Sequence, residues 1–332
     1  MIRHPDLAPD APVVVVGQAR LVERAVALVP VAETPPARTL AAAVVVGDDV
    51  VPAVGPVPAG PDPGQRRRFG ARRTGGGGAP AAGAEKTVAT PRTFQPADPI
   101  APDRVSHRAW DQIVQAHVHD GQVDYPAIQA DGTLDGYLRE LNRIDPTRLL
   151  GRQDQLAFWI NAYNAFAVKG IVDHYSPMTL WGRYRYFIGR DYQIGGTTIN
   201  LYDLERQVLI EQFHEPLMHF AIVCASTSCP KLQPWAYQPD QLDRQLVQVA
   251  KAFINDSTRN RFDRKLKTAS LSMIFQWFEK DFADAAGSAL AYIARYVDDP
   301  ELARELVQPG YSIEYLEYDW SLNGIPPSPH GS

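Results

Sequence analysis

The chain has 332 residues, a net charge of −5 at pH 7 and two cysteines. This weak negative charge gives no general attraction to nucleic acid. Two cysteines are too few for a disulfide-rich scaffold or for a zinc site with four cysteine ligands.

The composition changes near residue 95, and this change predicts two unlike parts. All six tryptophans and all fourteen tyrosines lie at Trp110 or later. Residues 1–100 are rich in proline, alanine and glycine, and they bury too little surface to offset an ordering entropy of roughly 1–2 kcal/mol per residue. We therefore expect a disordered tail over residues 1–100, a globular domain over 101–326 and a flexible C-terminus over 327–332. The alternative for the tail is upstream DNA translated from a wrongly chosen start.

The tail also bears on membranes and nucleic acid. Its valine runs at 13–16 and 44–46 are far shorter than the roughly 20 apolar residues of a spanning helix. The N-terminus lacks the basic start, apolar stretch and cleavage site of a signal peptide. Five arginines between positions 66 and 73 stand in a glycine-rich stretch that is typical of a solvated linker. We expect no integral membrane segment and no nucleic-acid partner, and the compartment stays open.

The rest of the sequence alternates between helical and strand-like patterns. Helical spacing of apolar residues predicts helices over 105–118, 134–144, 152–175, 204–213, 242–253 and 285–297, and one that begins at a Ser270 cap and buries a stripe of phenylalanines. Alternating or continuous apolar runs predict a hairpin over 192–201, a buried central strand over 219–224, a short strand over 265–269 and a last strand over 312–318. This order predicts an α+β fold, a single mostly helical domain around a small mixed or antiparallel sheet.

The segment MHFAIVCASTSCP, residues 218–230, holds the predicted chemistry. It contains both cysteines, and a neighbouring histidine is the simplest way to make a thiol reactive. On a regular strand His219 and Cys224 would face opposite ways, so Cys229, after a polar bend, is the better partner for His219. Three alternatives remain: Cys224 as a core residue, a Cys224–Cys229 disulfide, and a hydrogen-bonded core histidine. The same separation on the strand argues against a metal site.

Two further groups of polar residues are candidates. Asn161 and Asn164 share one face of the long apolar helix, where their amides need partners. They either orient a catalytic group or tie the helix to a neighbouring loop. An aromatic and acidic group suggests a binding cleft, although its acids could instead cap turns. Its members are Trp277, Asp281, Asp319, Trp320 and Asn323.

Four motifs in order resemble the domain-of-unknown-function family 547. They are FWINAYN at 158–164, HFAIVCASTSCPKL at 219–232, SLSMIFQWFEKDF at 270–282 and YLEYDWSLN at 315–323. The resemblance covers roughly residues 105–325 and implies a fold boundary more than an activity; similar bacterial proteins are often exported. A fainter likeness to transglutaminase-like and papain-like thiol enzymes implies a cysteine on the long helix, where this chain has Asn161 and Asn164.

Two functions follow as hypotheses. In the first, the protein is a thiol-dependent hydrolase or acyl transferase on amides or esters, without a cofactor. Cys229 attacks, His219 accepts its proton, and Asn161 or Asn164 orients the imidazole or donates to the oxyanion. In the second, the aromatic cleft makes the protein a non-catalytic binding module. The partner in either case is a small molecule or peptide.

Overall fold

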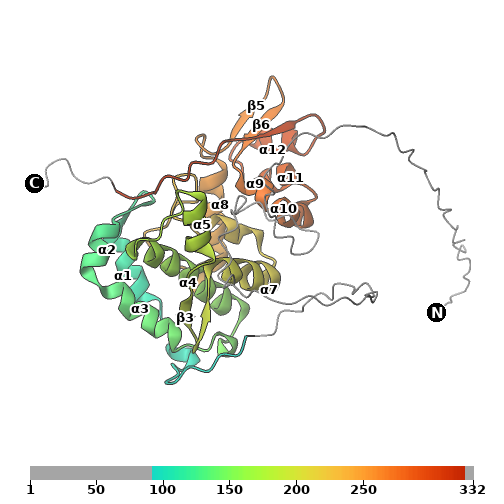
Figure 1. Cartoon of the computed structure of the whole chain (residues 1–332). Helices are drawn as coiled ribbons and strands as arrows, with labels where there is room; N and C mark the ends of the chain where they lie inside the picture. The colour runs from blue at the N-terminus through green and yellow to red at the C-terminus, as the bar shows by residue number, and fades with distance from the viewer. Residues whose placement is uncertain (1–91, 326–332) are drawn as a thin grey trace, which may run out of the picture. The chain divides into compact units, whose positions relative to one another are not determined.

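The computed structural model describes residues 92–325 (Figure 1). The predicted tail up to residue 91 and the C-terminus from residue 326 lie outside the described residues. Residues 92–100 pack against the domain: the Phe94 ring lies 6.0 Å from that of Trp159, and Arg92 forms an ion pair with Asp203. The folded part therefore includes residues before position 101.

The described part is an α+β fold of many helices and three small sheets, as the sequence predicts. The α-helices are α1 Arg108–His117, α2 Tyr125–Asp131, α3 Thr133–Asn142, α4 Arg152–Val172, α5 Leu180–Phe187, α6 Leu201–Asp203, α7 Glu211–Phe213, α8 Leu242–Ile254, α9 Ile274–Trp277, α10 Glu279–Ala286, α11 Ala289–Ile293 and α12 Pro300–Leu306. A π-helix, Leu204–Ile210, joins α6 to α7, and short 3₁₀ helices occur at Pro102–Arg104, Pro146–Arg148, Pro216–Phe220 and Pro239–Gln241. The strands are β1 Val118–His119, β2 Gln122–Val123, β3 Tyr192–Ile194, β4 Thr197–Ile199, β5 Arg261–Asp263, β6 Thr268–Leu271 and β7 Ser312–Tyr315.

Helix α4 forms the centre of the fold (Figure 1). It is apolar on nearly all sides, and such a helix is stable only when neighbours cover it completely. Its residues from Leu156 to Val168 are all buried, and α2, α3 and the π-helix pack against it. This packing places Asn161 and Asn164 in the core, so the partners of their amides must come from the chain around them.

The predicted hairpin is confirmed as β3 and β4, which pair antiparallel with Tyr192 opposite Ile199. Gly195 and Gly196 form its turn with φ of 58° and 78°, a two-residue turn with two positive φ values that matches the twist of paired strands. A Cβ at Gly196 would lie 2.2 Å from the backbone oxygen of Gln95. Glycine is therefore required here both by conformation and by the close approach of residues 92–100.

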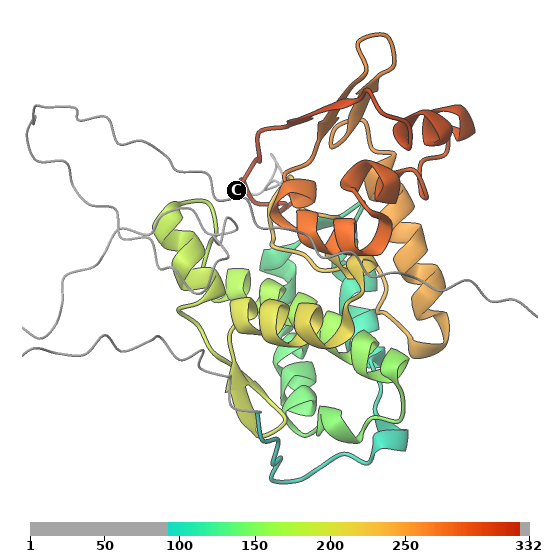
Figure 2. The same ribbon diagram turned by 90° about the vertical axis from the view of Figure 1, so that its right-hand side faces the viewer.

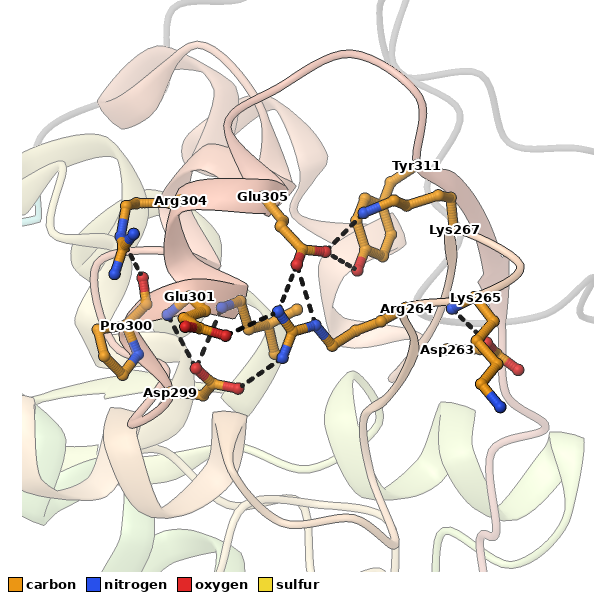
Figure 3. Close-up of polar contacts among 11 residues, drawn as sticks. Asp263, Arg264, Lys265, Lys267, Asp299, Pro300, Glu301, Arg304, Glu305 and Tyr311 are labelled. Carbon is orange, nitrogen blue, oxygen red and sulfur yellow. Dashed lines mark hydrogen bonds and ion pairs between the residues drawn. The ribbon is translucent and has the colours of Figure 1, made fainter.

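The three-stranded sheet lies at the opposite end of the described part from the β3–β4 hairpin (Figure 2). In it β5 and β6 pair antiparallel, while β6 and β7 pair parallel. Arg264 in the β5–β6 turn pairs with three acids on and before α12, namely Asp299, Glu301 and Glu305 (Figure 3). These groups lie at the surface, where ion pairs contribute little to folding stability. We infer that they orient the β5–β6 hairpin.

Two predictions near this sheet are wrong in detail. Ser270 lies in β6 and caps no helix; the hydroxyl of Ser272 accepts the N–H of Ile274 instead. The helix predicted over 285–297 is shorter, because α10 ends at Gly287 with φ of 85° and Ser288 caps a new helix, α11. The predicted phenylalanine stripe is nevertheless buried, at Phe275, Phe278 and Phe282.

After β7 the chain runs back across the domain and connects its two ends. Ser226 forms an isolated bridge with Leu322, and Val123 of β2 forms one with Gly324. The backbone N–H of Asn323 also donates to the carbonyl of Ala225. Residues 318–323 are thereby held against the loop that contains the cysteines.

Candidate active site

The segment that contains both cysteines is not a strand, so the predicted strand over 219–224 is wrong. Residues Pro216–Phe220 form a 3₁₀ helix, and the chain from Ala221 to Cys229 is a buried loop with turns. Asn164 satisfies the backbone of this loop: its Nδ2 donates to Ala221 O at 2.9 Å, and its Oδ1 accepts Val223 N–H at 3.0 Å. Without strand alternation, His219 and Cys224 can face the same cavity.

One pocket brings these side chains together. It encloses about 600 Å³ of empty space, part of it open to solvent, and His219, Cys224 and Cys229 all line it. Aromatic residues make up much of the remaining wall, in particular Tyr163, Phe187, Tyr202, Trp277, Phe278, Tyr318 and Trp320. A concave, largely apolar site with a few convergent polar groups is the usual form of a ligand pocket.

Cys224 lies at the centre of a small hydrogen-bond cluster. Its sulfur is 3.0 Å from the Ser226 hydroxyl and 3.2 Å from the Tyr318 hydroxyl, and these two oxygens are 3.2 Å apart. The backbone N–H of Cys224 donates to the sulfur of Cys229 at 2.7 Å. Both cysteines are free thiols, so the alternative of a disulfide is not what the structure contains.

The surroundings of the two thiols shift their pKa values in opposite directions. Burial raises the pKa of Cys224, but hydrogen bonds from the Cys229 thiol, the Ser226 hydroxyl and the Tyr318 hydroxyl outweigh it and lower the pKa to about 7. Burial and the neighbouring Cys224 raise the pKa of Cys229 well above its usual range. The lower pKa of the two thiols therefore belongs to Cys224.

The accessibility of the two thiols agrees with this order. Cys229 is 4% exposed, whereas Cys224 is only partly buried. The prediction that Cys229 is the better nucleophile stays a prediction, and the burial of Cys229 and its raised pKa favour Cys224 instead. The polar bend turns inward, because the N–H of Cys229 donates to Ser226 O at 3.1 Å and its sulfur receives the N–H of Cys224.

The residue after Cys224 has an unusual backbone. Ala225 is buried and has φ of 59°, in the left-handed region that costs a non-glycine residue roughly 1–2 kcal/mol. Strained residues of this kind persist where the surroundings over-determine them, and they cluster at functional sites. Here the backbone N–H of Asn323 donates to the Ala225 carbonyl at 3.2 Å and helps to hold this turn.

His219 is buried and bonded to a carboxylate. Its Nε2 lies 2.8 Å from Oδ2 of Asp281, and its ring stacks on Phe278 with 3.9 Å between centroids. Within residues 92–325 its Nδ1 has no hydrogen-bond partner. Burial raises the pKa of Asp281, but the hydrogen bond and charge of His219 outweigh it, so the pKa is lowered. When Nε2 donates to Asp281, Nδ1 carries the free lone pair.

The side chains of the two asparagines hydrogen-bond the backbone of neighbouring segments. Both are fully buried, and each uses its amide on the backbone: Asn164 on the Cys224 loop, and Asn161 on the N–H and carbonyl of Tyr237 at 2.9 and 2.8 Å. Asp281, not an asparagine, orients the imidazole of His219. Through these contacts Asn161 and Asn164 connect α4 to neighbouring loops, which was the alternative to a catalytic role.

The predicted cleft residues divide into two groups. Trp277 and Trp320 line the pocket, and their rings lie 5.9 Å apart, each 4.7 Å from that of Tyr318. Asp319 is exposed and caps a turn by accepting the N–H of Ser321, and Asn323 accepts the Tyr125 hydroxyl at 2.6 Å. Asp319 and Asn323 are thus turn and packing residues outside the pocket wall.

Three residues of the site were missed in the sequence. Ser226 and Tyr318 contact Cys224, and Glu205 lines the pocket from the π-helix. Ser226 and Tyr318 both stand in motifs noted above, but nothing in the sequence shows that residues 92 positions apart meet. Among the residues that the structure describes, no group of three or more His, Cys, Asp or Glu side chains could hold a metal ion, and no helix could cross a membrane.

Comparison with known proteins identifies one family. The model of the family described as "Protein of unknown function, DUF547" matches residues 147–254, which include α4, the π-helix, both cysteines and α8. No curated protein and no solved structure matches the chain. The resemblance that the sequence motifs suggest is thereby confirmed, since residues 147–254 of this chain are similar to the DUF547 family.

Proposed function

We propose that this domain is a thiol-dependent hydrolase or acyl transferase that acts on an amide or ester, with Cys224 as its nucleophile. One observation carries the proposal: the Cys224 sulfur lies 3.0 Å from the Ser226 hydroxyl and 3.2 Å from the Tyr318 hydroxyl, in a pocket that His219 also lines. A thiolate is the nucleophilic form of cysteine, and a pKa near 7 gives a large thiolate fraction at neutral pH. Hydroxyl groups, not the imidazole, stabilise the charge on sulfur in the resting site.

His219 then acts on the substrate and on water. The free Nδ1 of His219 accepts the Cys224 thiol proton as the sulfur bonds to the substrate carbonyl carbon, and the imidazolium so formed gives that proton to the departing amine or alcohol as its bond to the carbon breaks. Water, or a second acceptor in a transferase, next attacks the thioester, the imidazole takes its proton, and the thiolate leaves. Asp281 stabilises the imidazolium, as its 2.8 Å contact with Nε2 allows.

The test is acylation of the full-length protein by a reactive ester, p-nitrophenyl acetate, followed by mass spectrometry of its peptides. We expect an acetyl group on Cys224 and loss of the adduct in Cys224→Ser. Cys229→Ser is the matched control, because it keeps a hydroxyl donor beside Cys224 and should still acylate. Acetylation of Cys229 in place of Cys224, or of neither cysteine, would refute the assignment.

The packed rings of Trp277, Tyr318 and Trp320 favour a second candidate function, a non-catalytic binding module for a small molecule or peptide. Aromatic walls bury much apolar surface on binding whether or not chemistry follows. The two functions differ in one outcome of the same experiment. A binding module would show no thioester at Cys224, although changes to Trp277 would still alter ligand binding.

A further inference from the structure

The charged side chains of the pocket beside Cys224 are of interest for the choice of ligand. Of the residues between 92 and 325 that line it, Glu205 is the one carboxylate, His219 is the one histidine, and none is a lysine or arginine. Arg206 follows Glu205 in the sequence, but it is not part of the pocket wall. Its guanidinium carbon lies 5.2 Å from the ring centroid of Phe278. The Cys224 thiolate adds a second negative charge to the same cavity. A negatively charged cavity attracts cations and repels anions.

Glu205 is held in place but keeps a free acceptor. Its Oε2 accepts the hydroxyl of Tyr163 at 3.2 Å, and Tyr163 is fixed within the buried helix α4. In the described part of the chain, Oε1 accepts no hydrogen bond. The π-helix Leu204–Ile210 that presents Glu205 is itself a rare element that occurs frequently at functional sites. A preorganised carboxylate with one free oxygen is a suitable partner for an N–H donor.

The aromatic walls favour the same ligand chemistry. Ring faces attract cations, most strongly those of tryptophan, and the attraction increases when water is excluded. Trp320 already shows this property on one face, since the guanidinium carbon of Arg183 lies 4.5 Å from its ring centroid. Carboxylate and aromatic rings together match a group that combines positive charge with N–H donors.

We propose that the pocket selects substrates that carry an ammonium or guanidinium group, which Glu205 binds while the reacting carbonyl lies at Cys224. This inference rests on the proposed function for its catalytic meaning and names the substrate class of the same site. An anionic substrate would meet both Glu205 and the thiolate, and a neutral one would leave the free oxygen of Glu205 without a partner. Glu205 is thus a specificity residue and takes no part in bond breaking.

The first test measures charge selectivity at the thiol of the full-length protein. Three methanethiosulfonates of similar size carry a primary ammonium, a hydroxyl or a sulfonate group; each forms a mixed disulfide with Cys224 and releases methanesulfinate. We expect the cationic reagent to react about tenfold faster than the anionic one. Glu205→Gln should remove most of this preference. Glu211→Gln, which removes an exposed carboxylate on α7 outside the pocket, should leave it unchanged.

A second measurement separates this inference from the proposed function. Quenching of tryptophan fluorescence by n-butylammonium and by butanoate is compared in Cys224→Ser, with and without Glu205→Gln, because Trp277 and Trp320 line the pocket. Binding of butylammonium alone, weakened severalfold by Glu205→Gln, supports the inference even if Cys224 proves unreactive. A reactive Cys224 with the same charge selectivity in Glu205→Gln, or equal binding of both ions, overturns it and leaves the proposed function standing.

Discussion

Replacing Asn164 by alanine is expected to lower the free energy of unfolding by about 2–6 kcal/mol and to slow thiol modification at Cys224. The substitution leaves two buried backbone groups, Ala221 O and Val223 N–H, without their partner, and each such group costs roughly 1–3 kcal/mol. The same two groups define the loop that leads into Cys224. Urea unfolding and the rate of alkylation by iodoacetamide check the two effects on one protein preparation.

Asn161 offers the matched control for this prediction. Asn161→Ala removes an equivalent pair of buried hydrogen bonds, but it does so at Tyr237, which does not line the pocket. It should destabilise the protein by a similar amount and leave the alkylation rate of Cys224 unchanged in the folded state. If both variants slow alkylation equally, or if Asn164→Ala costs less than about 1 kcal/mol, the assigned role of Asn164 is wrong.

Replacing His219 by glutamine is expected to slow hydrolysis of the acetyl-Cys224 intermediate by about 10²–10⁴-fold, the usual contribution of a general acid–base group. Acylation by an activated ester should change much less, because hydroxyl groups and not the imidazole stabilise the Cys224 thiolate. Asp281→Asn should slow hydrolysis less than His219→Gln does, since it removes only the orienting carboxylate. The decay of the acetylated peptide, followed by mass spectrometry, gives these rates.

The control for a merely structural effect is His107, another buried histidine. It is 5% exposed, hydrogen-bonds Tyr137 at 2.8 Å and is not part of the pocket wall. His107→Gln should lower stability and leave the lifetime of acetyl-Cys224 unchanged. If acetyl-Cys224 has the same lifetime in the wild type and in His219→Gln, the imidazole takes no part in hydrolysis.

The helical part of the fold could be predicted from the sequence because its signals are local. The apolar periodicity of α1, α3, α4 and α8 and the paired glycines of the β3–β4 turn lie within the elements they define. Where the chain breaks a pattern with a single residue, the prediction fails. Gly287 ends α10 in the middle of a stretch that otherwise has helical spacing.

The loop with the cysteines could not be predicted in this way. An apolar run of six residues predicts a buried strand, and burial is correct, since five of the residues from His219 to Cys224 are buried. Its backbone, however, is satisfied by Met218 O, the side chain of Asn164 and the sulfur of Cys229 rather than by a neighbouring strand. A side chain that replaces a sheet partner leaves no trace in local periodicity.

The sequence predicts where the candidate site lies, but not the contacts that each of its residues makes. Both cysteines, His219, Trp277 and Trp320 do line one pocket. The order of the two thiols depends on Tyr318, which reaches Cys224 from 94 positions away, and on the inward turn at Cys229. Asp281 was noted for its aromatic neighbour, whereas its contact is with His219, 62 positions earlier. Such pairings depend on tertiary structure.

The central claim is that Cys224, and not Cys229, is the thiolate of this site. The most direct measurement is the alkylation rate of each cysteine between about pH 5 and about pH 9, assigned by mass spectrometry of the reduced, full-length protein. Because the thiolate reacts, the rate at Cys224 should rise with pH through an apparent pKa of about 7. The rise should shift to higher pH in Tyr318→Phe, while Cys229 stays slow throughout. Faster alkylation of Cys229, or an ordinary thiol pKa of about 8.5 at Cys224, would contradict the account.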